Sequence, residues 1–268
     1  MTKLTRTPEE LQQALDHGGA NGAVSLVPTM GALHSGHISL VREAQKLGNP
    51  VVVSIFVNPL QFAPGEDLDA YPRTLDEDLA KLESEGVEAV FAPSVSTMYP
   101  HGTRTTIHPG PLGAVLEGKT RPTHFAGVLT VVAKLFALTG ATDAFFGEKD
   151  YQQLALIRQM VEDLHLPVRI HGCPIIREES GLALSSRNRY LSEAEQEAAM
   201  ALSRALATGT YEAALAELDA AEGIELDYLE VTTPDLSEVP EGYHGPGRLL
   251  VAAKVGQTRL IDNAAIDI

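Results

Sequence analysis

The chain has 268 residues, of which 44% are hydrophobic and 21% charged, a composition typical of a globular protein with one large domain or two modest ones. Its net charge of −16 repels nucleic-acid phosphates, so we expect no nucleic-acid partner. Small anionic substrates are not excluded, because local basic residues can still bind them. The lone Cys173 excludes a disulfide framework and a cysteine metal cluster, and it fits a reducing, cytoplasmic location.

The N-terminal segment predicts a helix where a signal peptide would need an apolar core. Thr7 is a capping residue, Pro8 stands at the first helical position, and Glu10 lies three residues after the cap. We therefore expect a helix that begins at Pro8 and ends near His17.

Residues 23–47 predict a strand, a turn and a helix. Ala23–Val27 is a short apolar run, and we expect Pro28 to end the strand because proline donates no hydrogen bond to a sheet. From His37 onward, apolar residues recur at helical spacing. A helix that begins directly after a parallel strand offers free N–H groups and positive dipole charge, which suit a phosphate.

Two histidines mark the start of that helix. His34 and His37 are three residues apart, so they share one face of the first helical turn. They could be polar surface residues or metal ligands, but a zinc site needs three or four ligands and no HExxH pattern is present. The segment is neither a dinucleotide-binding glycine motif nor a P-loop. It resembles the HxGH signature of nucleotidyl-transferring Rossmann-like enzymes, in which the histidines hold ATP phosphates.

Strands and helices alternate up to residue 176. We expect strands at 51–57, 88–91, 143–146 and 168–176, and helices at 74–85, 124–138 and 151–164. Residues 92–122 are rich in proline and glycine and predict an irregular binding loop or lid. The helix at 124–138 is apolar on nearly every face, so it is buried in this core or against a second copy. The alternation predicts an α/β fold, a Rossmann-like doubly wound parallel sheet.

The pattern changes after residue 176. Two helices, beginning near Ser192 and Tyr211, precede short strands at 226–231, 248–253 and 258–261. Helices followed by consecutive strands predict a smaller α+β domain. We therefore expect one domain at 1–176 and a C-terminal lid domain at 177–268.

Polar residues stand at several predicted strand ends and at the domain boundary. Asn58 and Gln61 follow the strand at 51–57, where open α/β sheets bind ligands, although an Asn-Pro pair is equally typical of a plain turn. Lys149 follows the strand at 143–146 and is either a ligand-binding cation or a surface lysine. Residues 184–188, Leu-Ser-Ser-Arg-Asn, combine hydroxyl groups with a guanidinium that can bind phosphate, or form a solvated loop.

Taken in chain order, the motifs resemble the pantothenate synthetase family nearly end to end. They are PTMGALHSGH, SIFVNPLQF, YPRT, RPTHFAGVLTVVAKLF, FFGEKDYQQL, LSSRNRYLS, YLEV, GRLLVAAKVG and TRLIDN. Two departures are small: Ser35 stands where the family often has glutamate, and Leu184 where it often has methionine. Neither change touches a residue expected to bind phosphate.

The resemblance implies a reaction in two steps. The pantoate carboxylate attacks the α-phosphorus of MgATP and gives pantoyl adenylate and pyrophosphate. The amine of β-alanine then attacks the mixed anhydride and gives pantothenate and AMP, a step in pantothenate and coenzyme A biosynthesis. Both steps build charge on oxygen atoms, which calls for cations and preorganised donors rather than a covalent nucleophile. The family also implies Mg²⁺, whose ligands the sequence does not identify, and a cytoplasmic homodimer with no membrane partner.

The resemblance also assigns residue roles. It implies that His34, His37 and Lys149 act at the ATP phosphates, with His37 as proton donor. The implied ATP-binding residues are Met30, Gly31, Ala32, Leu33, His34, Ser35, Gly36, His37, Gly147, Glu148, Lys149, Asp150, Ile176, Leu184, Ser185, Ser186 and Arg187. Asp150 would bind the ribose and Ile176 would meet adenine through its backbone. The implied pantoate-binding residues are Gln61, Gln153 and Asn58, and Gln61 also lies in the β-alanine site; Glu117 and Arg121 are further candidates.

Two alternatives compete with this interpretation. A cytidylyl- or adenylyltransferase would form the nucleotide adduct and release it without joining an amine. Its release of AMP would therefore not depend on β-alanine. A nucleotide-sensing homologue without activity would be expected to have lost a histidine or the lysine, and this sequence retains His34, His37 and Lys149.

Overall fold

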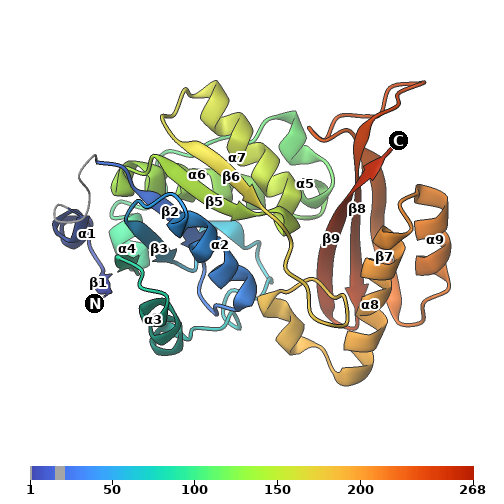
Figure 1. Ribbon diagram of the computed structural model, residues 1–268, viewed down its shortest axis with the longest axis horizontal. Helices are drawn as coiled ribbons and strands as arrows, with labels where there is room; N and C mark the ends of the chain where they lie inside the picture. Colours follow the sequence, from blue (N-terminus) through green and yellow to red (C-terminus); the bar gives the residue numbers. More distant parts are fainter. Residues whose placement is uncertain (1, 16–21) are drawn as a thin grey trace. The chain divides into compact units, whose positions relative to one another are not determined.

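The structure is a computed structural model that describes residues 2–15 and 22–268, and it divides the chain into two compact units (Figure 1). Unit 1 comprises Met1–Glu148 and Gln152–Cys173, and unit 2 comprises Lys149–Tyr151 and Pro174–Ile268. The N-terminal helix α1 spans Pro8–Leu15, and its expected continuation to His17 lies outside the described residues.

Unit 1 is built on a six-stranded, fully parallel sheet with the strand order β1-β4-β3-β2-β5-β6. The strands are β1 (Lys3–Thr5), β2 (Ser25–Thr29), β3 (Val51–Ile55), β4 (Ala89–Phe91), β5 (Asp143–Gly147) and β6 (Arg169–Cys173). The chain moves outward from β2 through β3 and β4, then returns to place β5 on the other side of β2. This reversal is the switch point of a doubly wound sheet, and the predicted fold class is confirmed.

Helices cover both faces of this sheet. The helices α1, α6 (His124–Thr139) and α7 (Tyr151–Asp163) share a core with one face, and α2 (Ser35–Gln45) and α3 (Leu75–Ser84) share a core with the other (Figure 1). Neighbouring strand residues point to opposite faces, so Leu26 belongs to the first core and Val27 to the second. Strands buried on both faces explain the continuous apolar runs in the sequence.

The apolar helix α6 is buried within unit 1 itself. Its large side chains, including Phe125, Leu129 and Phe136, pack in the same core as Leu26. The apolar surface of α6 therefore finds its partners within one chain, and the expectation of a dimer rests on the family resemblance alone. Among the described residues, no helix is long and apolar enough to cross a membrane.

The prediction that Pro28 ends the strand is wrong. β2 continues to Thr29, and Pro28 pairs in register with Ser54 of β3. On its other side, β2 pairs with β5 only at Ser25 and Leu26. Beyond those residues β2 has a single partner, so a residue without an N–H group is tolerated there as at a sheet edge.

The segment expected to be irregular, residues 92–122, contains three short helical turns. These are α4 (Val95–Met98), η2 (Pro111–Ala114) and α5 (Glu117–Thr120). The buried amide of Gln152 accepts a hydrogen bond from the Glu117 N–H at 3.0 Å and donates to the carbonyl oxygens of Leu112 and Val115, both at 2.8 Å. Because one side chain satisfies three backbone groups, this segment is fixed to α7.

Unit 2 contains an antiparallel sheet, β7-β8-β9, with two helices packed on it. Its elements are η4 (Ser186–Tyr190), α8 (Glu193–Ala207), α9 (Tyr211–Asp219), β7 (Ile224–Thr232), β8 (Pro246–Val255) and β9 (Thr258–Asp267). β9 is longer than the predicted strand at 258–261, because Asp262 and Asn263 continue it as buried polar residues. The short helix η3 (Glu148–Asp150) carries the chain from β5 to α7.

Candidate active site

The turn after β2 is held in shape by a buried carboxylate. Gly31 and Ala32 adopt left-handed backbone conformations, with φ of +84° and +51°. The N–H groups of Ala32 and Leu33 both donate to the carboxylate of Asp78 on α3, at 2.9 and 2.8 Å. Lys81, one helical turn further along α3, donates to the Leu33 carbonyl at 2.7 Å. Asp78 has no distinguishing sequence pattern, because an acidic residue in a predicted helix is typical of a solvent-exposed face.

The two histidines cap helix α2 with their Nδ1 atoms. His34 Nδ1 accepts from the Gly36 N–H at 3.1 Å, and His37 Nδ1 accepts from the His34 N–H at 3.3 Å. An Nδ1 atom that accepts a hydrogen bond carries no proton, so each neutral imidazole carries its proton on Nε2. The rings lie 4.1 Å apart between centroids. The pair therefore has the tautomers needed to donate two Nε2–H groups to an anion.

Asn58, at the end of β3, is a positioning residue in this structure. Its side chain is fully buried, and Nδ2 donates to Gln61 Oε1 and to the Gly127 carbonyl oxygen, both at 3.1 Å. Its Oδ1 accepts from the Tyr99 hydroxyl at 3.0 Å and from the Leu60 N–H at 3.3 Å. These four bonds use the full capacity of the amide. The predicted contact of Asn58 with pantoate stays a prediction, and the geometry favours an effect through Gln61.

Tyr99 and Gly127 support this arrangement. Burial raises the pKa of Tyr99 to about 12, so its hydroxyl stays protonated and keeps donating to Asn58. At Gly127, an added Cβ atom would lie 2.3 Å from the carbonyl oxygen of Leu60. Glycine is therefore required where α6 meets the short helix η1 (Pro59–Gln61).

Gln61 is anchored at every group except its amide nitrogen. Its Oε1 accepts from Asn58, and its carbonyl oxygen accepts from the Arg121 guanidinium at 3.1 Å and faces His124 Nδ1 at 3.0 Å. Arg121 is itself fixed by an ion pair with Glu66 at 2.7 Å. Because Asn58 can only donate here, Oε1 points toward Asn58 and Nε2 points away from it. Within the described residues, Nε2 donates to no protein group, which leaves two hydrogens for a ligand.

The two neighbouring glutamines of α7 differ in role. Gln152 is buried and its amide is occupied by the backbone of residues 112–117. Gln153 is half-buried, and its side chain makes no hydrogen bond to any residue that the structure describes. Of the two, only Gln153 has a side-chain amide without a hydrogen-bond partner among the described residues, and its predicted contact with pantoate stays a prediction.

Lys149 belongs to unit 2 and has a half-buried side chain. Its ammonium group makes no hydrogen bond or ion pair with residues in the described part of the chain. It lines a small hollow together with Ser185, Asn188 and Asp262. The Oδ1 atom of Asn188 is buried without a partner. Two of the residues predicted to bind phosphate, Lys149 and Ser185, thus meet within one unit.

The remaining predicted residues of unit 2 form a backbone turn. The Leu184 N–H donates to the Ile176 carbonyl at 2.9 Å, and the Ile176 N–H has no partner among the described residues. Ser185 Oγ accepts from the Arg187 N–H at 3.3 Å and begins η4. The predicted ATP-binding residues are therefore shared between the units: 30–37, 147 and 148 lie in unit 1, and 149, 150, 176 and 184–187 in unit 2.

Comparison with known proteins gives a consistent result. The family model described as pantoate-beta-alanine ligase matches residues 3–265. A pantothenate synthetase from Corynebacterium jeikeium is 63% identical over 258 residues, which cover 92% of this chain and 84% of that protein. The crystal structure of pantothenate synthetase from Thermus thermophilus has a TM-score of 0.91 and 46% identity, covering 98% of this chain and 99% of that one. A pantoate-beta-alanine ligase from Francisella tularensis, in complex with beta-gamma ATP and beta-alanine, has a TM-score of 0.86 and 36% identity, covering 98% and 97%.

Proposed function

The chain belongs to the pantoate-beta-alanine ligase family, and we propose how its residues divide the work of that reaction. The enzyme joins pantoate to β-alanine at the expense of ATP, through pantoyl adenylate, and releases pyrophosphate and AMP. The observation that supports this division is that His34 and His37 both accept a capping hydrogen bond of α2 through Nδ1, which leaves the proton of each neutral ring on Nε2.

The first step builds negative charge on the phosphate oxygens as the pantoate carboxylate attacks. The carboxylate is already ionised at neutral pH, so this step needs no general base. It needs donors placed where the charge develops, and we assign that role to His34, His37 and Lys149. Ser185, Ser186 and Arg187 would bind further phosphate oxygens with hydroxyl and guanidinium groups. Ile176 would offer its N–H group to adenine and Asp150 its carboxylate to the ribose.

We assign pantoate binding to Gln61 and Gln153. A neutral amide suits a small hydroxylated acid, because it can donate to an oxygen without holding the nucleophilic carboxylate as an ion pair. Gln61 would donate through Nε2, and Gln153 would bind through its unpartnered amide. Asn58 would keep the Gln61 amide in the correct orientation. Gln61 would also border the site of β-alanine, the second substrate.

Three further properties are part of the proposal. Mg²⁺ would enter with ATP and be held mainly by phosphate oxygens and water. In support, residues 2–15 and 22–268 contain no group of three or more His, Cys, Asp and Glu that could hold a metal ion by itself. The enzyme would act in the cytoplasm as a homodimer.

The order of the two steps predicts which substrates support pyrophosphate exchange. We expect radioactive pyrophosphate to enter ATP when pantoate is present, with no need for β-alanine, because adenylation alone is reversible. AMP release should require all three substrates. The alternative that stops at the adduct predicts no effect of β-alanine on AMP release. Exchange that proceeds equally without pantoate would refute the two-step order.

Replacement of Gln153 tests the pantoate site. We expect Gln153→Ala to raise the KM for pantoate about 5- to 12-fold and to change the KM for ATP less than threefold, because a bound hydroxyl or carboxylate loses a donor worth roughly 1–1.5 kcal/mol. Steady-state kinetics with each substrate varied in turn measures the difference. Gln159→Ala, a half-buried glutamine on the same helix, is the matched control. A larger effect on ATP than on pantoate would reverse the assignment.

A further inference from the structure

Strand β9 buries two polar residues that the reaction scheme leaves without a role. Asp262 and Asn263 are 3% and 2% exposed, although a sequence of Asp-Asn is more typical of a turn. Asp262 forms an ion pair with Arg177 at 2.6 Å. Asn263 instead connects β9 to the residue that we place at the ATP phosphates. Buried polar groups require hydrogen-bond partners, so the partners of Asn263 indicate what it does.

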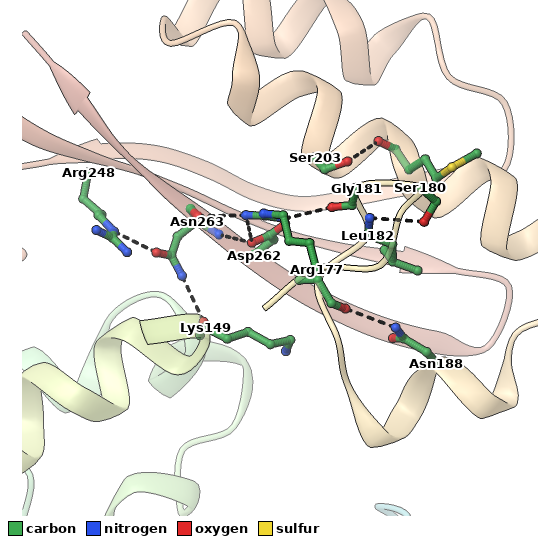
Figure 2. A network of polar contacts seen from close by, with 12 residues as sticks. Lys149, Arg177, Ser180, Gly181, Leu182, Asn188, Ser203, Arg248, Asp262 and Asn263 are labelled. Carbon is green, nitrogen blue, oxygen red and sulfur yellow. Dashed lines mark hydrogen bonds and ion pairs between the residues drawn. The ribbon is translucent and has the colours of Figure 1, made fainter. Parts of the chain in front are cut away.

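The amide of Asn263 lies between Arg248 and the main chain of Lys149 (Figure 2). Its Oδ1 accepts from Arg248 Nε at 2.7 Å, and its Nδ2 donates to the Lys149 carbonyl oxygen at 2.9 Å. A guanidinium can only donate and a carbonyl can only accept, so the orientation of the amide is fixed by its partners. The positive charge on Arg248 polarises the amide and strengthens its bond to Lys149.

A second contact holds the same segment two residues further along. The Arg248 guanidinium lies 3.9 Å from the centre of the Tyr151 ring, a cation–π distance. The Tyr151 hydroxyl donates to the Pro234 carbonyl oxygen at 2.9 Å. Residues 149 and 151 are therefore both attached to the C-terminal sheet of unit 2, through buried groups of β8 and β9.

From this geometry we infer that Asn263 is a positioning residue for Lys149, with Arg248 and Tyr151 as its supports. The Lys149 side chain makes no hydrogen bond or ion pair with described residues, so no polar side-chain contact holds its ammonium group and the position of its backbone becomes decisive. The bond from Asn263 fixes that backbone at the lysine itself. A displacement of about 1 Å at a catalytic group can cost roughly 10²-fold in rate, so this bond acts on the reaction without touching a substrate. The inference rests on the proposed role of Lys149.

The sharpest test is Asn263→Asp, which keeps the shape and the acceptor for Arg248 but places an acceptor against the Lys149 carbonyl. We expect pantoyl adenylate formation, followed by rapid quench, to slow about 10- to 100-fold. Reaction of supplied pantoyl adenylate with β-alanine should change less than threefold. Asp227→Asn, which breaks an exposed ion pair with Arg259 on the same sheet, is the matched control and should leave both steps unchanged.

A double-mutant cycle separates positioning from general stability. When Lys149 is already alanine, Asn263→Asp should slow adenylation further by less than threefold, because the group that it positions is gone. Equal losses in both half-reactions, or full additivity with Lys149→Ala, would overturn the inference. If Asn263→Asp does not fold, Arg248→Lys gives the same test, since it removes the guanidinium from Tyr151 and keeps the charge. Should Lys149→Ala alone leave adenylation unchanged, the proposed role of Lys149 fails. A loss with Lys149→Ala but none with Asn263→Asp would overturn the positioning role alone.

Discussion

We expect Lys149→Ala to slow pantoyl adenylate formation roughly 10²–10³-fold, equivalent to about 3–4 kcal/mol of transition-state stabilisation. Its ammonium group has no hydrogen-bond or ion-pair partner in the described part of the chain, and it lines a hollow with Ser185. An ammonium group without a polar partner in the protein can stabilise the negative charge that develops on the phosphate chain. Because that charge is greatest in the transition state, the rate should fall more than the affinity for ATP.

The measurement separates the two half-reactions. Rapid quench of enzyme mixed with ATP and pantoate gives the adenylation rate, and supplied pantoyl adenylate with β-alanine gives the rate of amine attack. The second rate should change much less, since no pyrophosphate leaves in that step. Lys254→Ala, an exposed lysine on β8, is the control for loss of a positive charge in the same unit. If amine attack falls as far as adenylation, Lys149 serves acyl transfer and the assignment is wrong.

The fold could be predicted from the sequence because its signals are local and strong. Apolar runs such as Val51–Ile55 are typical of parallel strands that helices cover on both faces, and their alternation with helical patterns predicts the fold class. The errors occurred where tertiary pairing overrides a local signal. Pro28 stays in a strand because the pairing of β2 with β5 stops at Leu26, which leaves Pro28 a strand partner on one side only. β9 continues through Asp262 because the buried carboxylate is paired with Arg177, a residue outside the sheet.

The sequence predicts the candidate site less completely than it predicts the fold. A motif identifies residues such as His37 and Gln153, to which the family resemblance assigns a role in ligand binding. It does not identify the residues that hold them, because a supporting side chain has no local pattern of its own. Asp78 holds the turn after β2 from 46 residues away, and Asn263 reaches Lys149 from 114 residues away. Asn58 stood out in the sequence, yet only the structure shows that its amide is fully occupied.

His37 performs two tasks through two different nitrogen atoms, and a pair of substitutions separates them. Nδ1 accepts from the His34 N–H and completes the cap of α2, while Nε2 carries the proton that we assign to the phosphates. In His37→Asn, the Oδ1 atom replaces Nδ1 as the acceptor and no donor remains at the position of Nε2. In His37→Gln, the amide nitrogen takes the position of Nε2 and the acceptor of the cap is lost.

We expect His37→Asn to keep the thermal unfolding midpoint near that of the wild type and to slow adenylation roughly 10²–10³-fold, the usual cost of one preorganised donor. The adenylation rate of His37→Gln should be at least tenfold higher than that of His37→Asn, because an amide N–H remains at the position of Nε2. Its free energy of unfolding should be lower by about 1 kcal/mol, because the acceptor of the helix cap is lost. Rapid-quench rates and urea unfolding of both variants give the comparison. The opposite ranking, with Asn active and Gln inactive, would mean that His37 acts by shaping the start of α2, and the donor role would pass to His34 and Lys149 alone.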